Sequence, residues 1–232
     1  MGHKKLIRFA EMETFANVIQ PGITHKGNWH NYYNNNNNII VELACGKGEY
    51  TVGLAKLYPT PNYIGVDVKG NRMWVGAKKC IKENITNVAF IRTQIDLIQQ
   101  HFATNEVSEI WITFPDPQLR WSKMNRRLTH PKFLRFYKTF LKPGGLVHLK
   151  TDSTDLYNFT KKVIELYNLK CIDDNNDVHH TEVKEELKIK THYEGLNISG
   201  SNKIYYLCFT VDAIGNNKDE ALKAFFKPTE IV

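Results

Sequence analysis

The chain has 232 residues, of which 42% are hydrophobic and 24% are charged, and its formal net charge is +7. This length and composition suit one globular α/β domain with a sizeable core. No run of about eighteen apolar residues is present, and the N-terminus lacks the hydrophobic region of a secretion signal. We therefore expect a soluble cytoplasmic protein without a membrane partner.

Four cysteines are widely separated and form no Cys-x-x-Cys pair. Three of them lie in apolar segments that are typical of strands or helices. Cysteines of this kind in a cytoplasmic protein are usually reduced and packed in the core. We expect this of Cys45, Cys80, Cys171 and Cys208, and we expect no metal site.

The N-terminal residues predict a helix followed by a loop. From Lys4 to Ile19 apolar residues recur at helical spacing, and a Pro-Gly pair ends the pattern. The segment from Gly27 to Asn38 is polar and aromatic and closes with five consecutive asparagines, which indicates an exposed surface loop. We expect residues 1–38 to flank or pack on a main domain that covers residues 39–232. The pattern leaves open what the helix contacts.

A strand, a glycine loop and a helix follow. Ile39–Cys45 is an apolar run typical of a strand buried on both faces, Gly46–Gly48 is the loop, and Glu49–Tyr58 has helical spacing. Glycines at such a turn let the backbone approach a ligand. The next strand ends at Asp67, about twenty residues later, where an acid can accept hydrogen bonds from a ribose diol.

The charges around the glycine loop favour S-adenosylmethionine over a dinucleotide. A dinucleotide fingerprint would need a third glycine where Thr51 stands, and its pyrophosphate would meet Glu42 and Glu49. S-adenosylmethionine carries a sulfonium and an ammonium group and no phosphate, so carboxylates in a partly buried cleft stabilise it. The spacing Glu42-x-x-x-Gly46-x-Gly48 is also the pattern of methyltransferases that use this methyl donor.

Further strands bring acids to the same edge. After the strand Val88–Arg92, Asp96 is a candidate contact of the adenine amino group, or alternatively an N-cap of the next helix. The strand Leu146–Thr151 ends at Asp152. The alternation predicts a Rossmann-like α/β fold with seven strands, mainly parallel with an antiparallel terminal strand. The remaining predicted elements are the helices Gly70–Asn84, Leu97–Phe102, Pro131–Leu141 and Leu156–Tyr167, the strands Leu169–Ile172 and Lys203–Val211, and a mobile polar segment, Asp173–Thr181.

The segment after the strand Val107–Thr113 is central to the prediction. Pro115 and Pro117 restrict the backbone on both sides of Asp116, which stands at the carboxyl end of a strand, where open α/β sheets bind ligands. The alternative is a turn whose acid caps the next helix, but that helix begins about fifteen residues later. The placement therefore favours Asp116 as a site residue.

Cations gather directly after this acid. Residues 115–142 carry eight cations and one acid, so their net charge of +7 equals that of the whole chain. Such clustering is typical of a surface that binds phosphate-rich nucleic acid, although a solvated charged face is the alternative. The eight cations are Arg120, Lys123, Arg126, Arg127, Lys132, Arg135, Lys138 and Lys142.

Six short motifs occur in a defined order along the chain. They are Glu42-Leu43-Ala44-Cys45-Gly46-Lys47-Gly48, Phe114-x-Asp116-Pro117, Arg126-Arg127-Leu128, Phe133-Leu134, Lys150-Thr151-Asp152 and Thr191-His192-Tyr193-Glu194. In these motifs the chain resembles the tRNA (guanine-N7)-methyltransferases of the bacterial type, over about residues 39–211. The resemblance implies transfer of a methyl group from S-adenosylmethionine to N7 of a guanine in tRNA, nucleotide 46 of the variable loop.

The resemblance also implies roles for individual residues. Asp116 would be the catalytic residue and a cofactor contact. The further cofactor contacts would be Glu42, Asp67 and Asp96, to which the loop pattern adds Gly46 and Gly48. Substrate contacts would be Arg120, Asp152 and Thr191 to Glu194, to which the charge pattern adds Arg126 and Arg127.

The chain departs from the family in the basic loop. Members usually have Trp-Pro after the Asp-Pro pair, a Lys at the position of Arg120 and a His further on, where this chain has Gln118-Leu119 and Lys123. The cationic character is kept, but an aromatic ring that could stack on the substrate is missing.

Several alternatives stay open. Methyltransferases that act on amino groups of adenine or cytosine have a second proline and an aromatic ring after the Asp-Pro pair, which Gln118-Leu119 does not provide. A small-molecule methyltransferase would not need the basic segment. A non-catalytic RNA-binding subunit could keep the fold, since fold alone does not set function, but it would gain nothing from acids in its cleft. The sequence is compatible with a monomer and with a homodimer.

Overall fold

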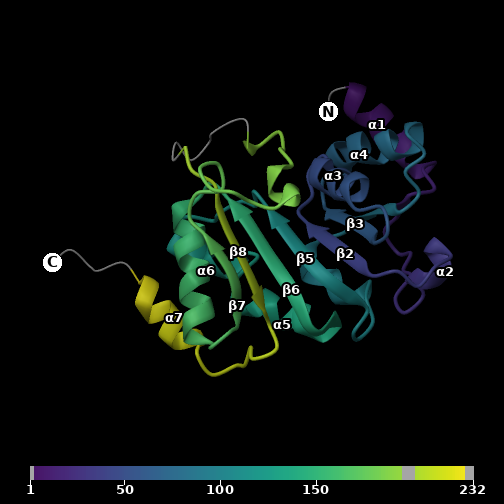
Figure 1. The fold of residues 1–232 in the computed structure, drawn as a ribbon. Coiled ribbons are helices and arrows are strands. Elements are labelled where there is room, and N and C mark those ends of the chain that lie inside the picture. Colours follow the sequence, from purple (N-terminus) through teal and green to yellow (C-terminus); the bar gives the residue numbers. More distant parts are fainter. Residues whose placement is uncertain (1–2, 195–201, 228–232) are drawn as a thin grey trace.

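One eight-stranded sheet forms the centre of the computed structural model, which describes residues 3–194 and 202–227 (Figure 1). The strand order is β1-β4-β3-β2-β5-β6-β8-β7; the neighbours from β1 to β6 are parallel, and β8 runs antiparallel to β6 and β7. The strands are β1 (Val18–Ile19), β2 (Ile39–Leu43), β3 (Asn62–Asp67), β4 (Val88–Arg92), β5 (Val107–Thr113), β6 (Leu141–Thr151), β7 (Cys171–Asn175) and β8 (Tyr205–Thr210).

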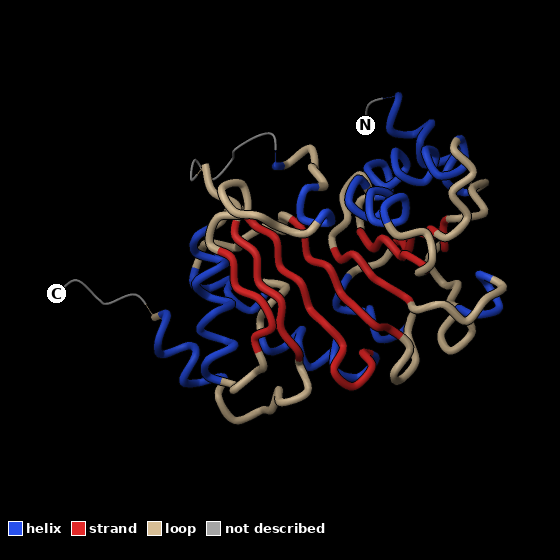
Figure 2. Tube along the Cα trace, in the orientation of Figure 1, coloured by secondary structure: helices blue, strands red, loops and turns tan. Residues whose placement is uncertain are grey.

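Helices cover both faces of this sheet. The layer of α1, α3 and α4 packs on one face, and the layer of α2, α5, α6 and α7 packs on the other (Figure 2). The α-helices are α1 (His3–Glu13), α2 (Trp29–Tyr33), α3 (Glu49–Leu57), α4 (Gly70–Lys82), α5 (Pro131–Phe140), α6 (Thr154–Leu166) and α7 (Asp219–Phe226). Within the described residues, 3-10 turns with complete bounds are η1 (Ile95–Gln100), η2 (Trp121–Arg126) and η3 (Glu185–Lys188).

The two layers explain why the central strands read as continuous apolar runs. In β2, Ile39, Val41 and Leu43 point into the core beneath α2, α5 and α6. Ile40 belongs to the second core, beneath α3, and Glu42 lies on that same side. Side chains alternate between the faces of a strand, so a strand covered on both faces buries every residue. All five residues of β2 are buried.

The N-terminal segment adds the eighth strand, which the sequence did not predict. The helix expected over Lys4 to Ile19 ends at Glu13, and β1 pairs in parallel with β4. Val18 and Ile19 are both buried there. Burial of two β-branched side chains at the sheet edge outweighs further turns of a short helix, which are marginal in water.

The loop expected from Gly27 to Asn38 contains the short helix α2, so its interpretation as a loop was wrong at residues 29–33. Trp29 is fully buried, and its Nε1 donates a hydrogen bond to the carbonyl of His101 at 2.9 Å. The indole also stacks on Phe102, with ring centroids 5.8 Å apart. The polar residues around Trp29 in the sequence gave no indication that its side chain is buried.

Smaller differences concern the ends of elements. The strand β7 extends to Asn175, so part of the segment expected to be mobile is paired with β8. The helix expected over Leu97–Phe102 is the 3-10 turn η1, and α7 was not predicted at all. All four cysteines are free, but Cys171 is exposed, so the prediction of a core position was wrong for it. No helix in the described part of the chain has the length and apolarity to cross a membrane.

Candidate active site

Two adjoining cavities open along the carboxyl edge of the sheet. The first has a volume of about 680 Å³ and the second about 700 Å³. Both are lined by Ala44, Asp67 and Val68, which lie directly after β2 and at the end of β3. Open parallel sheets bind their ligands at this edge. The two cavities therefore form one candidate site.

Acids outnumber bases on the wall of the first cavity, which carries four carboxylates and two cations. Such a wall suits a ligand with positive charge better than one with phosphates, because opposite charges stabilise each other in a partly buried cleft. The residues are Asp67, Asp116, Asp152 and Asp155, and Lys69 and Arg72.

Asp67 connects the glycine loop to the turn after β3. Its Oδ2 accepts a hydrogen bond from the amide of Gly46 at 2.9 Å, and its Oδ1 accepts one from the amide of Lys69 at 2.7 Å. Both amides are held by local turns, so the carboxylate has a defined position on the wall shared by the two cavities. The structure thus brings together two of the predicted cofactor contacts.

The two glycines of the loop have different surroundings. Gly46, with φ of 56°, lines the first cavity, and a Cβ there would lie 3.5 Å from the ring of Tyr193. Gly48, with φ of 71°, lines neither cavity, and a Cβ there would lie 2.6 Å from the ring of Phe90. The missing side chain of Gly48 therefore permits close packing of α3 on β4, whereas that of Gly46 leaves room at the cavity.

The Asp-Pro loop after β5 holds Asp116 in an exposed position on the wall of the first cavity. Asp116 Oδ1 accepts a hydrogen bond from the amide of Gln118 at 3.0 Å. Phe114 and Gln118 have φ of 46° and 47°, a left-handed conformation that is uncommon for residues other than glycine. Such conformations persist where the surrounding structure enforces them, and they cluster at functional sites.

Arg127 is one of the groups that enforce this loop conformation. It is 5% exposed, its Nε donates to the carbonyl of Gln118 at 3.3 Å, and its guanidinium lies 4.6 Å from the ring centroid of Phe159. Burial lowers its pKa, against the attraction of Asp155. The structure therefore places Arg127 behind the loop, whereas Arg126 is exposed and lines the second cavity.

Glu42 lies beneath the site and lines neither cavity. Its Oε2 accepts hydrogen bonds from the amide of Thr51 at 2.8 Å and from the Thr51 hydroxyl, and its Oε1 accepts one from the Thr113 hydroxyl at 2.6 Å. Burial raises its pKa to about 7, although these hydrogen bonds act in the opposite direction. Glu42 thus ties the start of α3 to the last residue of β5, from which the Asp-Pro loop begins.

Asp96 lies on the wall of the second cavity and forms an ion pair with Lys132 from α5. The alternative that Asp96 caps the following helix is wrong, because Gln94 occupies the N-cap position of η1. Both partners of the pair are partly exposed to solvent, so the carboxylate faces the cavity while it is paired.

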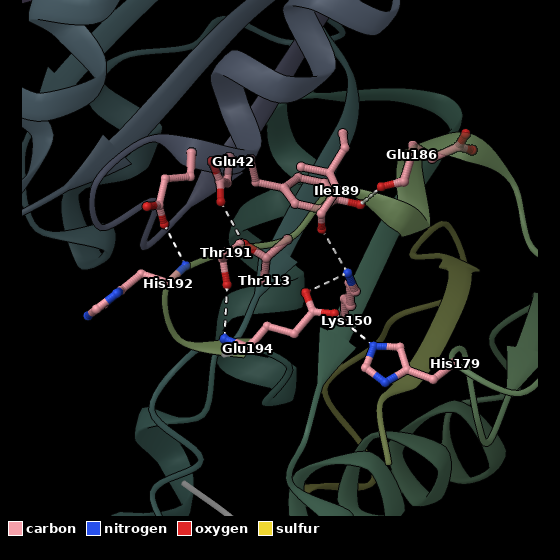
Figure 3. Close-up of polar contacts among 11 residues, drawn as sticks. Glu42, Thr113, Lys150, His179, Glu186, Ile189, Thr191, His192 and Glu194 are labelled. Atoms are coloured by element: carbon pink, nitrogen blue, oxygen red, sulfur yellow. Dashed lines mark hydrogen bonds and ion pairs between the residues drawn. The ribbon is translucent and has the colours of Figure 1, made fainter. Parts of the chain in front are cut away.

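The segment Thr191–Glu194 lies across the site and is fastened to several distant elements (Figure 3). The amide of His192 donates to Glu49 at the start of α3 at 2.7 Å. The Tyr193 hydroxyl accepts a hydrogen bond from Arg72 of α4, and its ring lines the first cavity. The Thr191 hydroxyl accepts a bond from the amide of Glu194 at 3.2 Å, which shapes the turn.

Glu194 itself is turned away from the cavities into a buried ion pair. Its Oε2 lies 3.0 Å from Nζ of Lys150, and its Oε1 lies 2.9 Å from Nε2 of His179. The side chain of Lys150 is 0% exposed and that of Glu194 is 5% exposed. Lys150 also donates to the carbonyl of Ile189 at 2.9 Å (Figure 3). Burial lowers the pKa of Lys150, and Glu194 opposes this shift.

The eight cations after Asp116 do not form one surface. Arg126 is exposed and lines the second cavity, Arg120 is exposed directly after the cavity-lining Leu119, Lys123 is half-buried, and Arg127 is buried. Each of the other four has a partner within the protein: Lys132, which lines the second cavity, pairs with Asp96, Arg135 with Asp219, Lys138 with the carbonyl of Ile214, and Lys142 with Asn38.

The sequence analysis missed Lys69 and Arg72 as lining residues and Lys150 as an anchor. Lys69 and Arg72 directly follow the predicted strand that ends at Asp67, so the rule that placed Asp67 at the carboxyl edge also points to them. No local signal in the sequence pairs Lys150 with Glu194, which is 44 residues away.

Comparison with solved structures identifies the fold. The structure of the 16S rRNA methyltransferase KamB superposes with a TM-score of 0.60 at 13% identity, over 81% of this chain and 94% of that chain. The 30S ribosomal A1408 methyltransferase from an uncultured bacterium gives a TM-score of 0.57 at 20% identity, over 79% of this chain and 92% of that chain. The fold is that of the S-adenosylmethionine-dependent methyltransferases, as predicted.

Comparison of sequences then identifies the family. A family model described as "Putative methyltransferase" matches residues 36–207. The chain is 46% identical to a tRNA (guanine-N(7)-)-methyltransferase of Christiangramia forsetii, over 91% of this chain and 100% of that protein. It is 41% identical to one of Bacteroides thetaiotaomicron, over 93% of this chain and 88% of that protein. The chain therefore belongs to the tRNA (guanine-N7)-methyltransferase family, which confirms the resemblance noted in its motifs.

Proposed function

We propose that this protein transfers the methyl group of S-adenosylmethionine to N7 of a guanine in tRNA, at nucleotide 46 of the variable loop, in the cytoplasm. The observation that carries the proposal is the acid-lined cavity at the carboxyl edge of the sheet, on whose wall the Asp-Pro loop holds Asp116. The names of the relatives support the choice of tRNA and of guanine N7.

The residues at the two cavities fit S-adenosylmethionine. Gly46 leaves the backbone accessible at the first cavity, and Asp67 stands on the shared wall, where it can accept bonds from a ribose diol. Asp96, on the second cavity, can accept a bond from the adenine amino group. S-adenosylmethionine supplies, when bound, an electrophilic methyl group on a positively charged sulfur. The acidic wall of the first cavity stabilises that charge.

The guanine would lie in the first cavity, against Asp116 and Asp152. Guanine N7 already carries a lone pair, so the site needs no base to remove a proton before the attack and no nucleophilic His or Cys. Holding the reacting atoms in line can contribute on the order of 7–11 kcal/mol in favourable cases. Asp116 and Asp152 can accept bonds from guanine N1-H and the 2-amino group and stabilise the positive charge that develops on the ring.

This arrangement also selects against adenine. Adenine does not present those donors in the same way, and it would leave the carboxylates unpaired at the cavity wall. Specificity would therefore arise from a penalty on the wrong base. We propose that Arg120 and Arg126, both exposed beside the cavities, contact phosphates of the tRNA.

The other predicted contacts would act indirectly. Glu42 has internal partners for both of its oxygens, and so does Glu194. We propose that Glu42 positions the Asp-Pro loop through Thr113, and that Glu194 positions the Thr191–Glu194 segment. Arg127 would hold the loop from behind through the carbonyl of Gln118.

The experiment that tests the function is a methyl-transfer assay with labelled S-adenosylmethionine and unmodified tRNA transcripts. Cleavage at 7-methylguanosine would locate the product, and a transcript with adenine in place of the variable-loop guanine is the control. We expect label only when that guanine is present. Methylation of the control transcript at the same level would refute the assigned position. If S-adenosylmethionine binds and no label is transferred, the acceptor is a different molecule. If S-adenosylmethionine does not bind, the protein is a non-catalytic RNA-binding subunit.

A further inference from the structure

A second group of cations lies beside the cavities, on the side of β3 and β4. The Asp-Pro loop and η2 follow β5, which is the neighbour of β2 on one side; β3 and β4 follow on the other side. None of these cations forms an ion pair with an acid within residues 3–194 and 202–227. The group consists of Lys5 and Arg8 on α1, Lys69 just before α4, Arg72 in the first turn of α4, and Arg92 at the end of β4.

Contacts connect several of these cations to the cavity wall. Lys69 lines the first cavity, and Gly70 follows it as the first residue of α4. A Cβ on Gly70 would lie 3.0 Å from the ring of Phe9 and 3.1 Å from the side chain of Arg92, so α1 packs directly on this turn. The Arg92 guanidinium lies 4.7 Å from the ring centroid of Phe9, and Nζ of Lys5 lies 6.0 Å from it.

Of the two acids of α1, Glu11 and Glu13, the first is paired with α4. Glu11 Oε2 accepts bonds from Nε1 of Trp74 at 2.6 Å and from Nζ of Lys78 at 3.1 Å, both on α4. Arg8 of α1 also contacts α4, because its guanidinium lies 4.5 Å from the ring centroid of Trp74. The ion pair of Glu11 is with Lys78, so neither Lys5 nor Arg8 forms an ion pair with an acid in the described part of the chain, although Arg8 is close enough to help lower the pKa of Glu11.

We propose that α1, together with Lys69 and Arg92, is a second surface that binds the tRNA backbone, at phosphates remote from the methylated guanine. This inference rests on the proposed function. Lys5 and Arg8 are three residues apart on α1 and so lie on one face of the helix, where both can reach the same stretch of backbone. The cavities would then lie between two cationic surfaces, one after β5 and one after β4, and the tRNA would cross both.

The test is a charge-neutralising triple variant, Lys5→Gln/Arg8→Gln/Arg92→Gln, assayed for tRNA binding at several salt concentrations. Each phosphate contact that is lost lowers the slope of log Kd against log salt by about 0.9 for a duplex. We expect the slope to fall by about 2 to 3 and the affinity for full-length tRNA to fall with it. The affinity for S-adenosylmethionine should stay unchanged, because none of the three residues lines a cavity.

A matched control removes the same charge from the far end of α4 and from the β7 edge of the sheet. Lys79 and Lys82 lie in the last turn of α4, and Lys170 lies just before β7; all three are exposed. The variant Lys79→Gln/Lys82→Gln/Lys170→Gln should keep the wild-type slope. A short hairpin RNA with the same target guanine gives a second comparison. It should bind the wild type and the α1 variant alike, since it does not reach α1.

The variant Glu11→Gln separates charge from packing. It weakens the tie of α1 to Trp74 and Lys78 but keeps every cation, so we expect the wild-type salt slope. A reduced slope in Glu11→Gln, or an unchanged slope in the triple variant of α1 and β4, would overturn the inference while wild-type methylation of tRNA stands. A wild-type protein that neither binds nor methylates tRNA would overturn the proposed function as well.

Discussion

The Asp-Pro loop and the Thr191–Glu194 segment were both expected to present an acid to the substrate. In the structure, the acid of the loop is exposed and the acid of the segment is buried. Asp116 is exposed on the cavity wall and accepts one hydrogen bond within its own turn, from the amide of Gln118. Glu194 is buried, with one oxygen on Lys150 and the other on His179. The Asp116 carboxylate can therefore still accept hydrogen bonds from a ligand. The Glu194 carboxylate has a protein partner on each oxygen and holds the chain in place.

This difference shows that an acid in a family motif can act in one of two ways. It can contact the ligand directly, or it can hold another segment of the chain in position. The loop is shaped mainly by residues near it in the sequence, since Pro115 and Pro117 restrict its backbone. The Thr191–Glu194 segment is shaped by partners far away in the sequence, including Glu49 and Lys150. Removal of the anchor should therefore cost stability, and removal of Asp116 should cost turnover.

The largest effect is expected for the buried ion pair. Lys150→Met would leave Glu194 as an unpaired buried charge beside His179, which costs about 3–5 kcal/mol of unfolding free energy. The double variant Lys150→Met/Glu194→Gln should recover part of this loss, because no unpaired charge remains. Urea denaturation of Lys150→Met, Glu194→Gln and the double variant measures the difference. A double variant that is destabilised by the sum of the two single losses would show that the pair does not anchor the segment.

The complementary prediction concerns Asp116. Asn has the same shape and can still accept the bond from the amide of Gln118, so Asp116→Asn should fold as the wild type does. We expect kcat to fall by about 100-fold or more, as when one preorganised group at a developing charge is removed. The affinity for tRNA should stay near normal, whereas that for S-adenosylmethionine should weaken, because Asp116 is also proposed as a cofactor contact on the acidic wall. Single-turnover methyl transfer at saturating substrate measures the effect, and a near-normal rate would remove Asp116 from the chemistry.

The support beneath the Asp-Pro loop should be visible in the pH dependence of stability. The pKa of Glu42 is raised to about 7 in the folded state from an ordinary value of 4.5, so the folded protein binds more protons between these pH values. Stability therefore falls as pH rises through this window, by on the order of 3 kcal/mol in total. Glu42→Gln should flatten the curve. Denaturation from pH 4.5 to 8 tests this, and parallel curves for the two proteins would contradict it.

The smallest effect is expected where Tyr193 meets Arg72. Tyr193→Phe removes the hydroxyl that accepts the bond from Arg72 but keeps the ring near Gly46. The loss of one such hydrogen bond is worth about 1 kcal/mol, or about fivefold in the Kd of S-adenosylmethionine by calorimetry. Tyr58→Phe is the matched control, because its hydroxyl bonds Glu186 and the residue lines neither cavity. Equal effects of the two variants would show that Tyr193 does not complete the site.

Patterns within short stretches were enough to predict most of the sheet and one edge of the site. Apolar continuity predicted the strands β2 to β6, and the residue types at their ends placed Asp67, Asp116 and Asp152 at the carboxyl edge. The sequence analysis was wrong where the structure of a segment depends on a partner far away in the sequence. Trp29 is buried because it reaches the carbonyl of His101, and β1 forms because β4 offers it an edge.

The sequence by itself determined the fold, the family and the acids that follow the strands, because strand burial, glycine turns and proline restriction act between neighbours along the chain. Only the tertiary structure decided which charged groups face the cavities. Arg127 lies behind the Asp-Pro loop, Lys132 pairs with Asp96, and Glu194 pairs with Lys150. A buried charged group is stable only if a partner of opposite charge or a hydrogen-bonding group compensates for its lost hydration. Which partner is near in space depends on the packing of the whole chain.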